Sequence, residues 1–187
     1  MSPTAFERTT EQPPSLATPA EPAAQPVHTI SILVRNKPGV LVRVALVFAR
    51  RGYNIESLVV SADVANGEFS RMTITCSGDP DTLDQIIKQV TKLVDVVHAI
   101  DHTGQAVIET EIALLKLKCS LSQRTEILQI AEHYRAKVVD YGSESLILRI
   151  YGASEKLDNV VALLRPFGIV ELVRSGKILM ARALETT

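Results

Sequence analysis

Two short polar segments flank an apolar stretch of the chain and are the residues best placed to bind a ligand. NKPG (36–39) precedes the stretch and GYN (52–54) follows it. Pro38 fixes one backbone angle, and Gly39 lacks the Cβ that would block close approach of a ligand. If a helix begins here, its first turn exposes backbone N–H groups at the positive end of the helix dipole. This arrangement favours a carboxylate or a phosphate.

A small carboxylate suits this position better than a nucleotide, because a phosphate loop normally has more glycines and a Lys-Ser/Thr pair. Asn36 adds a polar side chain, and Val40 and Leu41 offer an apolar wall. Asn54 carries both donor and acceptor groups, which suit an ammonium and a carboxylate. Two plainer interpretations stay open: NKPG is also a serviceable turn, and Asn54 fits a helix exit that satisfies local backbone groups.

Composition narrows the classes of function that this chain of 187 residues can have. A net charge of −1 and the absence of Trp argue against a nucleic-acid surface. No apolar run approaches the roughly 20 residues that span a bilayer, and the N-terminus lacks a secretory signal. Cys76 and Cys119 have no metal-ligand spacing, so we expect reduced, buried thiols, no metal site and a cytoplasmic chain.

The chain divides into a tail and two units of similar pattern. Residues 1–27 hold six of the nine prolines among Ala, Thr and Ser, which predicts a disordered tail. Strand-like and helix-like runs then follow in the order β-α-β-β-α-β, twice. The first expected helix begins within a few residues of Arg35 and runs to about Arg51, and the others lie at 79–92, 122–136 and 154–168. We therefore place one domain at residues 28–104 and a second at 105–187.

Each predicted helix has a single apolar stripe, as in Leu41, Val44, Ala45 and Phe48, which repeats at helical spacing. Such helices pack on one face of a sheet, so the fold class is α+β, with two tandem ferredoxin-like βαββαβ domains.

Local signals place two of the helix starts. Asp79 followed by Pro80 predicts an N-cap, and Ser122 is the expected cap of the third helix. Units of this size are marginally stable alone, so we also expect a two-fold dimer.

Longer motifs carry a family resemblance. NKPGVLVRVALVFARRGYNIESL (36–58), SRMTI (70–74) and KQVTKLVDV (88–96) closely resemble the regulatory small subunit of acetolactate (acetohydroxyacid) synthase. In that family an N-terminal ACT domain precedes a second ferredoxin-like domain, to which KLD (156–158) and RSG (174–176) are similar. Lys37 and Pro38 depart from the acidic or small residues of some members.

The resemblance implies a non-catalytic subunit that activates a thiamine-diphosphate catalytic subunit and confers feedback inhibition by a branched-chain amino acid, commonly valine. The family pairs two ACT domains side by side, with the effector between them. The matching positions are the loop residues Asn36, Gly39, Val40 and Leu41 of one domain, and Asn54 and Ile55 of its neighbour.

The same resemblance implies the partners and cofactors. The partners are a second copy of the chain, through its ACT domain, and the acetolactate synthase catalytic subunit, with no nucleic acid and no membrane. This chain would carry no cofactor, whereas the catalytic partner would carry thiamine diphosphate, Mg and FAD.

Three other functions were weighed. The histidines are scattered, and no nucleophile–base set stands out, which argues against an enzyme. His98 and His102 would lie roughly 13 Å apart on a strand, too far for one zinc ion, and Asp101-His102 fits a solvated strand end. An ACT-type amino-acid sensor that regulates a different enzyme or a transcription factor is the remaining alternative.

Overall fold

The computed structural model describes residues 26–62, 67–183 and 187. The predicted disordered tail therefore lies outside the described residues except at its end, where Val27 already belongs to a strand. The dipeptide Asn66-Gly67 predicts a hairpin turn in the first unit, but Asn66 also lies outside the described residues. The predicted junction at residues 104/105 falls between two strands of different sheets, and the domain boundaries themselves stay a prediction.

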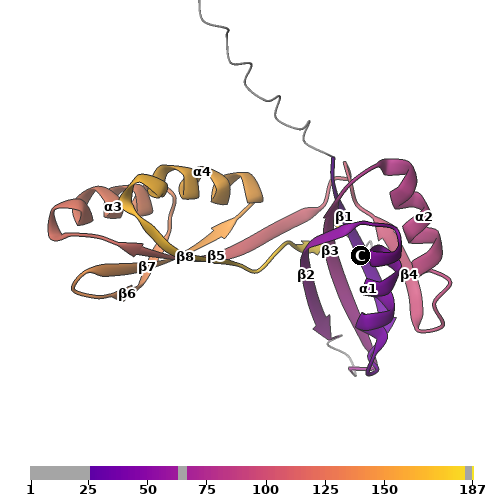
Figure 1. The fold of residues 1–187 in the computed structure, drawn as a ribbon. Coiled ribbons are helices and arrows are strands. Elements are labelled where there is room, and N and C mark those ends of the chain that lie inside the picture. The colour runs from indigo at the N-terminus through magenta and orange to yellow at the C-terminus, as the bar shows by residue number, and fades with distance from the viewer. Residues whose placement is uncertain (1–25, 63–66, 184–186) are drawn as a thin grey trace, which may run out of the picture.

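The first unit is an antiparallel sheet with both of its helices on one face (Figure 1). The sheet order is β2-β3-β1-β4, so β1 and β3 are central and β2 is an edge strand. The elements are β1 (Val27–Arg35), α1 (Val40–Arg50), β2 (Asn54–Ala62), β3 (Phe69–Ser77), α2 (Pro80–Val90) and β4 (Val96–Asp101).

The second unit repeats this arrangement, with the order β6-β7-β5-β8. Its elements are β5 (Ile108–Lys118), α3 (Leu121–His133), β6 (Lys137–Tyr141), β7 (Ser145–Gly152), α4 (Ser154–Leu164), the 3₁₀ turn η1 (Arg165–Phe167) and β8 (Ile169–Arg174). The predicted fold class, two tandem βαββαβ units, is confirmed. A final short strand, β9 (Ile178–Met180), pairs with the start of β5.

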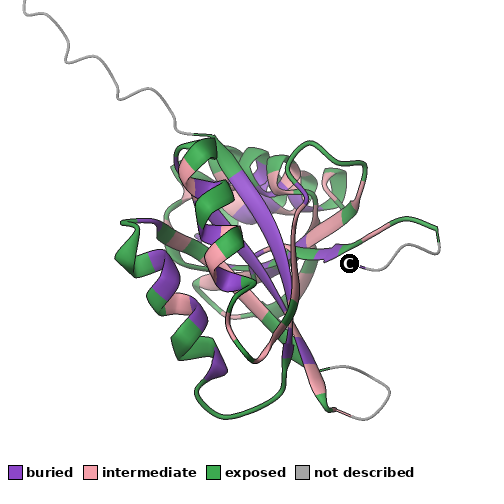
Figure 2. Cartoon of the chain, turned by 90° about the vertical axis from the view of Figure 1, so that its right-hand side faces the viewer, coloured by how far each residue is buried: buried purple, intermediate pink, exposed green. Residues whose placement is uncertain are grey.

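Each unit buries its own core between sheet and helices (Figure 2). In the first, Ile30, Ile32 and Val34 alternate along β1 and meet Val44 and Phe48 of the α1 stripe. Burial of each such side chain is worth about 1.5–3 kcal/mol, so register along β1 is strongly specified. The period of two in the strand and of 3.6 in the helix therefore fixes which face of each sheet is covered.

The predicted start of α2 is confirmed, whereas the predicted cap of α3 is wrong. The Asp79 side chain accepts a hydrogen bond from the Thr82 N–H at 2.9 Å, with Pro80 opening the helix. The cap of α3 is Ser120 instead of Ser122, because Gln123 completes a capping box with Ser120. The S-x-x-Q spacing that specifies this box was present in the sequence.

The prediction of a solvated pair at Asp101-His102 is also wrong for the histidine. His102 is buried, with Nε2 2.7 Å from the Ser31 hydroxyl and Nδ1 3.0 Å from Oε1 of Gln105. Ser31 lies on the helix-free face of the first sheet, so this network adds buried polar contacts to that face.

Cys76 is fully buried in the first core, so the reactivity of its thiol reports whether that core is folded. Desolvation, with smaller contributions from the charges of Glu56 and Asp101, raises the pKa of its thiol from 9.0 to about 11. The raised pKa alone lowers the thiolate fraction at pH 8 by about 100-fold.

We predict that iodoacetamide at pH 8 alkylates Cys76 at least 100-fold more slowly in the native Cys119→Ser protein than in the same protein in urea. Alkylation followed by mass spectrometry measures both rates. Comparable rates in the two states would contradict the buried position of Cys76.

Candidate functional site

The loop between β1 and α1 is held in place by its neighbours. The backbone N–H of Asn36 donates to the Glu68 carbonyl at 2.7 Å, and its side-chain Nδ2 donates to the Gly67 carbonyl at 3.0 Å. Asn36 therefore ties the loop to the turn that leads into β3, and it reaches this position from the end of the central strand. Because the side-chain amide N–H of Asn36 is already bonded to Gly67, its Oδ1 is the atom that could accept a hydrogen bond from a ligand.

Gly39 creates the open helix start that the sequence predicted. It is the N-cap of α1, with φ 81° and ψ −6°, a left-handed conformation that L side chains rarely adopt. It has no side chain to cap the helix, and the first turn contains no acidic residue. The Val40 N–H donates to the Lys37 carbonyl at 3.4 Å, so the N–H groups of Leu41 and Val42 are the ones left for a bound anion.

Two basic residues, Lys37 and Arg43, flank this turn in the sequence. Arg43 Nη2 is 2.5 Å from Asp95 Oδ2, at the base of β4. A Cβ added to Gly39 would lie 3.3 Å from Arg43 Nη1, so the guanidinium also limits the space beside the glycine.

The two apolar loop residues have different surroundings. Val40 is 2% exposed and belongs to the first core, so its side chain is not available to a ligand. The Leu41 side chain is 40% exposed, at the surface of the first helical turn. Leu41 is therefore the loop's apolar contact surface.

Asn54 and Ile55 lie at the other end of α1. Asn54 opens β2 and is exposed, while Ile55 is partly buried against the first core. The 11 residues of α1 separate these positions from Gly39 by roughly 16 Å. One chain therefore does not bring the two halves of the predicted site together.

Local packing fixes where Asn54 lies. Tyr53, which precedes it, is mostly buried, and its hydroxyl donates to the Asp79 carbonyl at the start of α2. Desolvation, with the charges of Cys76 and Asp79, raises the pKa of this phenol. Neutral Tyr53 therefore anchors the entry to β2, which lies at the edge of the sheet.

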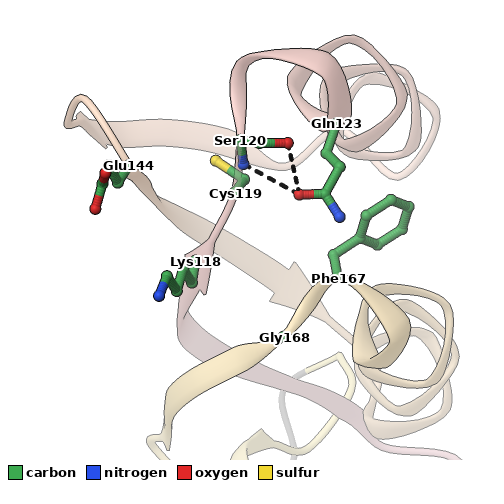
Figure 3. Close-up of a pocket in the computed structure, with 7 residues that line it drawn as sticks. All are labelled: Lys118, Cys119, Ser120, Gln123, Glu144, Phe167 and Gly168. Carbon is green, nitrogen blue, oxygen red and sulfur yellow. Dashed lines mark hydrogen bonds between the residues drawn. The ribbon is translucent and has the colours of Figure 1, made fainter.

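A cavity that sequence analysis did not predict lies in the second unit, at the junction of β5 and α3 (Figure 3). Its volume is about 330 Å³, and Cys119, Phe167 and Gly168 form part of its wall. The Ser120 N–H and hydroxyl both donate to Gln123 Oε1, at 3.1 and 2.9 Å. Because these polar groups cap α3, the start of α3, unlike that of α1, is capped by its own side chains.

Two negative findings apply to the described residues. Among residues 26–62, 67–183 and 187, no group of three or more His, Cys, Asp and Glu could hold a metal ion. Within the same part of the chain, no helix is long and apolar enough to cross a membrane.

Comparison with known proteins identifies both units. Residues 30–98 match a family described as the AHAS small subunit-like ACT domain, and residues 110–183 match one described as the small subunit of acetolactate synthase. The chain belongs to the acetolactate synthase small-subunit family.

Individual relatives agree with this assignment. The acetolactate synthase small subunit of Mycolicibacterium smegmatis is 41% identical over 157 residues, 84% of this chain and 92% of that protein. A probable acetolactate synthase small subunit of Methanothermobacter thermautotrophicus is 43% identical over 160 residues, 85% of this chain and 95% of that protein.

A solved structure gives the same result for the fold. The small subunit from Thermotoga maritima is 38% identical, with a TM-score of 0.76, and the match covers 86% of this chain and 99% of that one. The sequence resemblance to the acetolactate synthase small subunit, with its N-terminal ACT domain, is therefore confirmed.

In this small subunit, Gly39 gives a prediction about stability. Gly39→Ala should lower the free energy of unfolding by about 1–2 kcal/mol, because an L-residue is strained at positive φ. Gly39→Asn should cost clearly less, since Asn tolerates the left-handed conformation. Urea unfolding of the three proteins measures this, and an Ala variant as stable as the parent would contradict the described loop.

Proposed function

We propose that this chain is a non-catalytic regulatory subunit that activates a thiamine-diphosphate acetolactate synthase and confers inhibition by valine or another branched-chain amino acid. The observation that carries the proposal is the uncapped start of α1 at Gly39, in a chain of the acetolactate synthase small-subunit family. An uncapped helix start binds carboxylates, the group that every amino-acid effector carries.

The proposed effector site is shared between two copies. One copy supplies Asn36 and the helix start with Leu41, and its partner copy supplies Asn54 and Ile55. Because these groups are roughly 16 Å apart within a chain, a small ligand touches both only when a second copy brings its edge strand beside α1. The free edge of β2 is suited to such pairing.

The chemistry of each group follows from its surroundings. The effector carboxylate would accept hydrogen bonds from the N–H groups of the first turn of α1. Its branched side chain would lie between the exposed Leu41 and the half-buried Ile55. The amides of Asn36 and Asn54 would hydrogen-bond the ammonium and the carboxylate.

A ligand that bridges two ACT domains selects the mutual arrangement that fits it, and this makes binding a switch. Its effect on the catalytic subunit is then a coupling free energy between two separate sites. In the proposed complex, which we place in the cytoplasm, the catalytic subunit carries thiamine diphosphate, Mg and FAD.

Support for a non-catalytic chain comes from the histidines, which have structural contacts. His28 Nε2 lies 3.0 Å from the Gly78 carbonyl, and His102 lies against Ser31. His28 contacts a carbonyl, and the Ser31 hydroxyl beside His102 belongs to a residue only 1% exposed, where a substrate could not reach it as nucleophilic catalysis requires.

Calorimetric titration with valine tests the proposal. The chain should bind valine saturably, and Asn54→Ala should weaken binding at least tenfold, because it removes amide contacts to a charged ligand. The control is Asn159→Ala, the same substitution at an exposed position of α4, which should leave the affinity unchanged.

Leucine, isoleucine and serine complete the titration and rank the effectors. If none of the branched-chain amino acids binds, even with the catalytic subunit present, the effector half of the proposal is wrong. Inhibition that persists in a complex with Asn54→Ala would also count against the site.

A further inference from the structure

The end of the chain connects the second unit to the helix-free face of the first sheet. We define the C-terminal strap as residues 175–183. Figure 1 shows this segment, coloured yellow, leaving β8 and running past β5 to the first sheet. Within the strap, β9 pairs with residues 108–110 of β5, and Leu179 is 5% exposed.

The strap is firmly fixed where it leaves the second unit. Arg174 Nε donates to Glu111 Oε2 at 2.9 Å, and Nη1 is 2.5 Å from Asp158 Oδ1. Ser154 adds a hydrogen bond of 2.7 Å to the same glutamate, which is buried. Because the buried Glu111 accepts hydrogen bonds from both Ser154 and Arg174, β5, β8 and α4 hold the start of the strap as one unit.

Backbone and ionic contacts continue this hold along the strap. The Ser175 N–H donates to the Ile112 carbonyl at 2.9 Å, and the Ser175 hydroxyl accepts from the Ile112 N–H at 3.1 Å. Lys177 Nζ lies 3.0 Å from Glu109 Oε2. A movement of the strap is therefore tied to the first residues of β5, a central strand of the second sheet.

Gly176, between Ser175 and Lys177, contacts the first sheet directly. Gly176 has φ 81°, and a Cβ built on it would lie 2.8 Å from Ser57 Cβ and 3.4 Å from Val59 Cγ2. Only a glycine lets the backbone approach β2 this closely. A cleft of about 510 Å³, lined in part by Glu56, Ser57 and Gly176, lies beside the contact and leaves room for movement.

A bulge connects this contact to the proposed effector residues. The register of β2 against β3 shifts between Ile55 and Ser57, so Glu56 is the extra residue. Ile55 pairs with Cys76 and faces the core, whereas Ser57 pairs with Thr75 and faces the strap. Without the bulge, Ser57 and Ile55 would lie on the same face. Strand β2 thus carries the proposed effector residues, Asn54 and Ile55, on one side of the bulge, and Ser57, which contacts the strap, on the other.

We propose that effector occupancy is passed to the second domain through the contact between Gly176 and β2. The inference rests on the proposed function. The docked strap holds β2 in the arrangement that presents Asn54 and Ile55 to the effector, and effector binding in turn strengthens docking. This reciprocity is required of any two linked sites.

Gly176→Ala in the full-length chain tests the contact. The valine dissociation constant should rise at least fivefold, the lower end of typical coupling between sites. Hydrogen exchange of the β9 amides should slow when valine binds the parent protein and should not respond in the variant. Adding Ser57→Gly removes the clashing Cβ and should restore the affinity to within twofold of the parent.

Two further variants separate the contact from backbone strain. Gly168→Ala introduces the same strain at φ 86°, where the nearest atom to the new Cβ is 3.9 Å away, and should leave valine affinity within twofold. Ser57→Val crowds Gly176 from β2 with no positive-φ residue changed. It should weaken valine binding as Gly176→Ala does, which keeps the test available if Gly176→Ala fails to fold.

The outcomes distinguish the two proposals. If the parent binds valine and both Gly176→Ala and Ser57→Val bind it equally well, the coupling is wrong and the effector site stands. An equal loss in Gly168→Ala would also overturn the coupling, since strain alone would explain it. If the parent binds no branched-chain amino acid, the proposed function fails and the coupling falls with it.

Discussion

The length and rigidity of α1 are the constraint on which the rest of this account depends. The helix is packed into the first core along its apolar stripe, so its ends stay roughly 16 Å apart. The β1–α1 loop lies at one end and the start of β2 at the other. In the proposed site, an amino acid that contacts both ends would therefore lie between two copies of the chain, and its binding would depend on the geometry of the dimer.

The two units share an architecture but differ in the start of their first helix. In the first, Gly39 leaves the helix uncapped. In the second, the side chains of Ser120 and Gln123 occupy the equivalent donors and acceptors. The same fold thus leaves the start of this helix uncapped in the first unit and capped in the second. We infer from this difference that the second unit has another role. Its contacts with the C-terminal strap suit it to respond to effector binding in the first unit.

Local signals in the sequence were sufficient for most of the fold. A strand-like run after the tail predicted β1, and the Asp79-Pro80 pair predicted the start of α2, because each signal acts over a few residues. Two errors at Ser122 and His102 had different origins. The first overlooked a capping box at neighbouring positions, and the second missed a buried partner, Ser31, that is 71 residues away.

The candidate site divides in the same way. Gly39 and Leu41 were identifiable because an uncapped helix start is a local property. The burial of Val40, the bulge at Glu56 and the contact of Gly176 with β2 depend on which strands and segments become neighbours. The RSG motif at 174–176 was noticed as part of a resemblance, but its contacts with Glu111 and β2 arise only in the folded chain.

The shared site is tested most directly by mixing two defective chains. Leu41→Asp replaces the apolar contact proposed for the effector's branched side chain with a charge, and Asn54→Ala removes the contact from the opposite copy. Differently tagged chains allow the heterodimer to be purified and titrated with valine. The account predicts negligible binding to either homodimer and one valine per heterodimer, because one site receives both substitutions and the other receives neither. A heterodimer that binds no valine, beside a parent dimer that binds two, would contradict a site built from two chains.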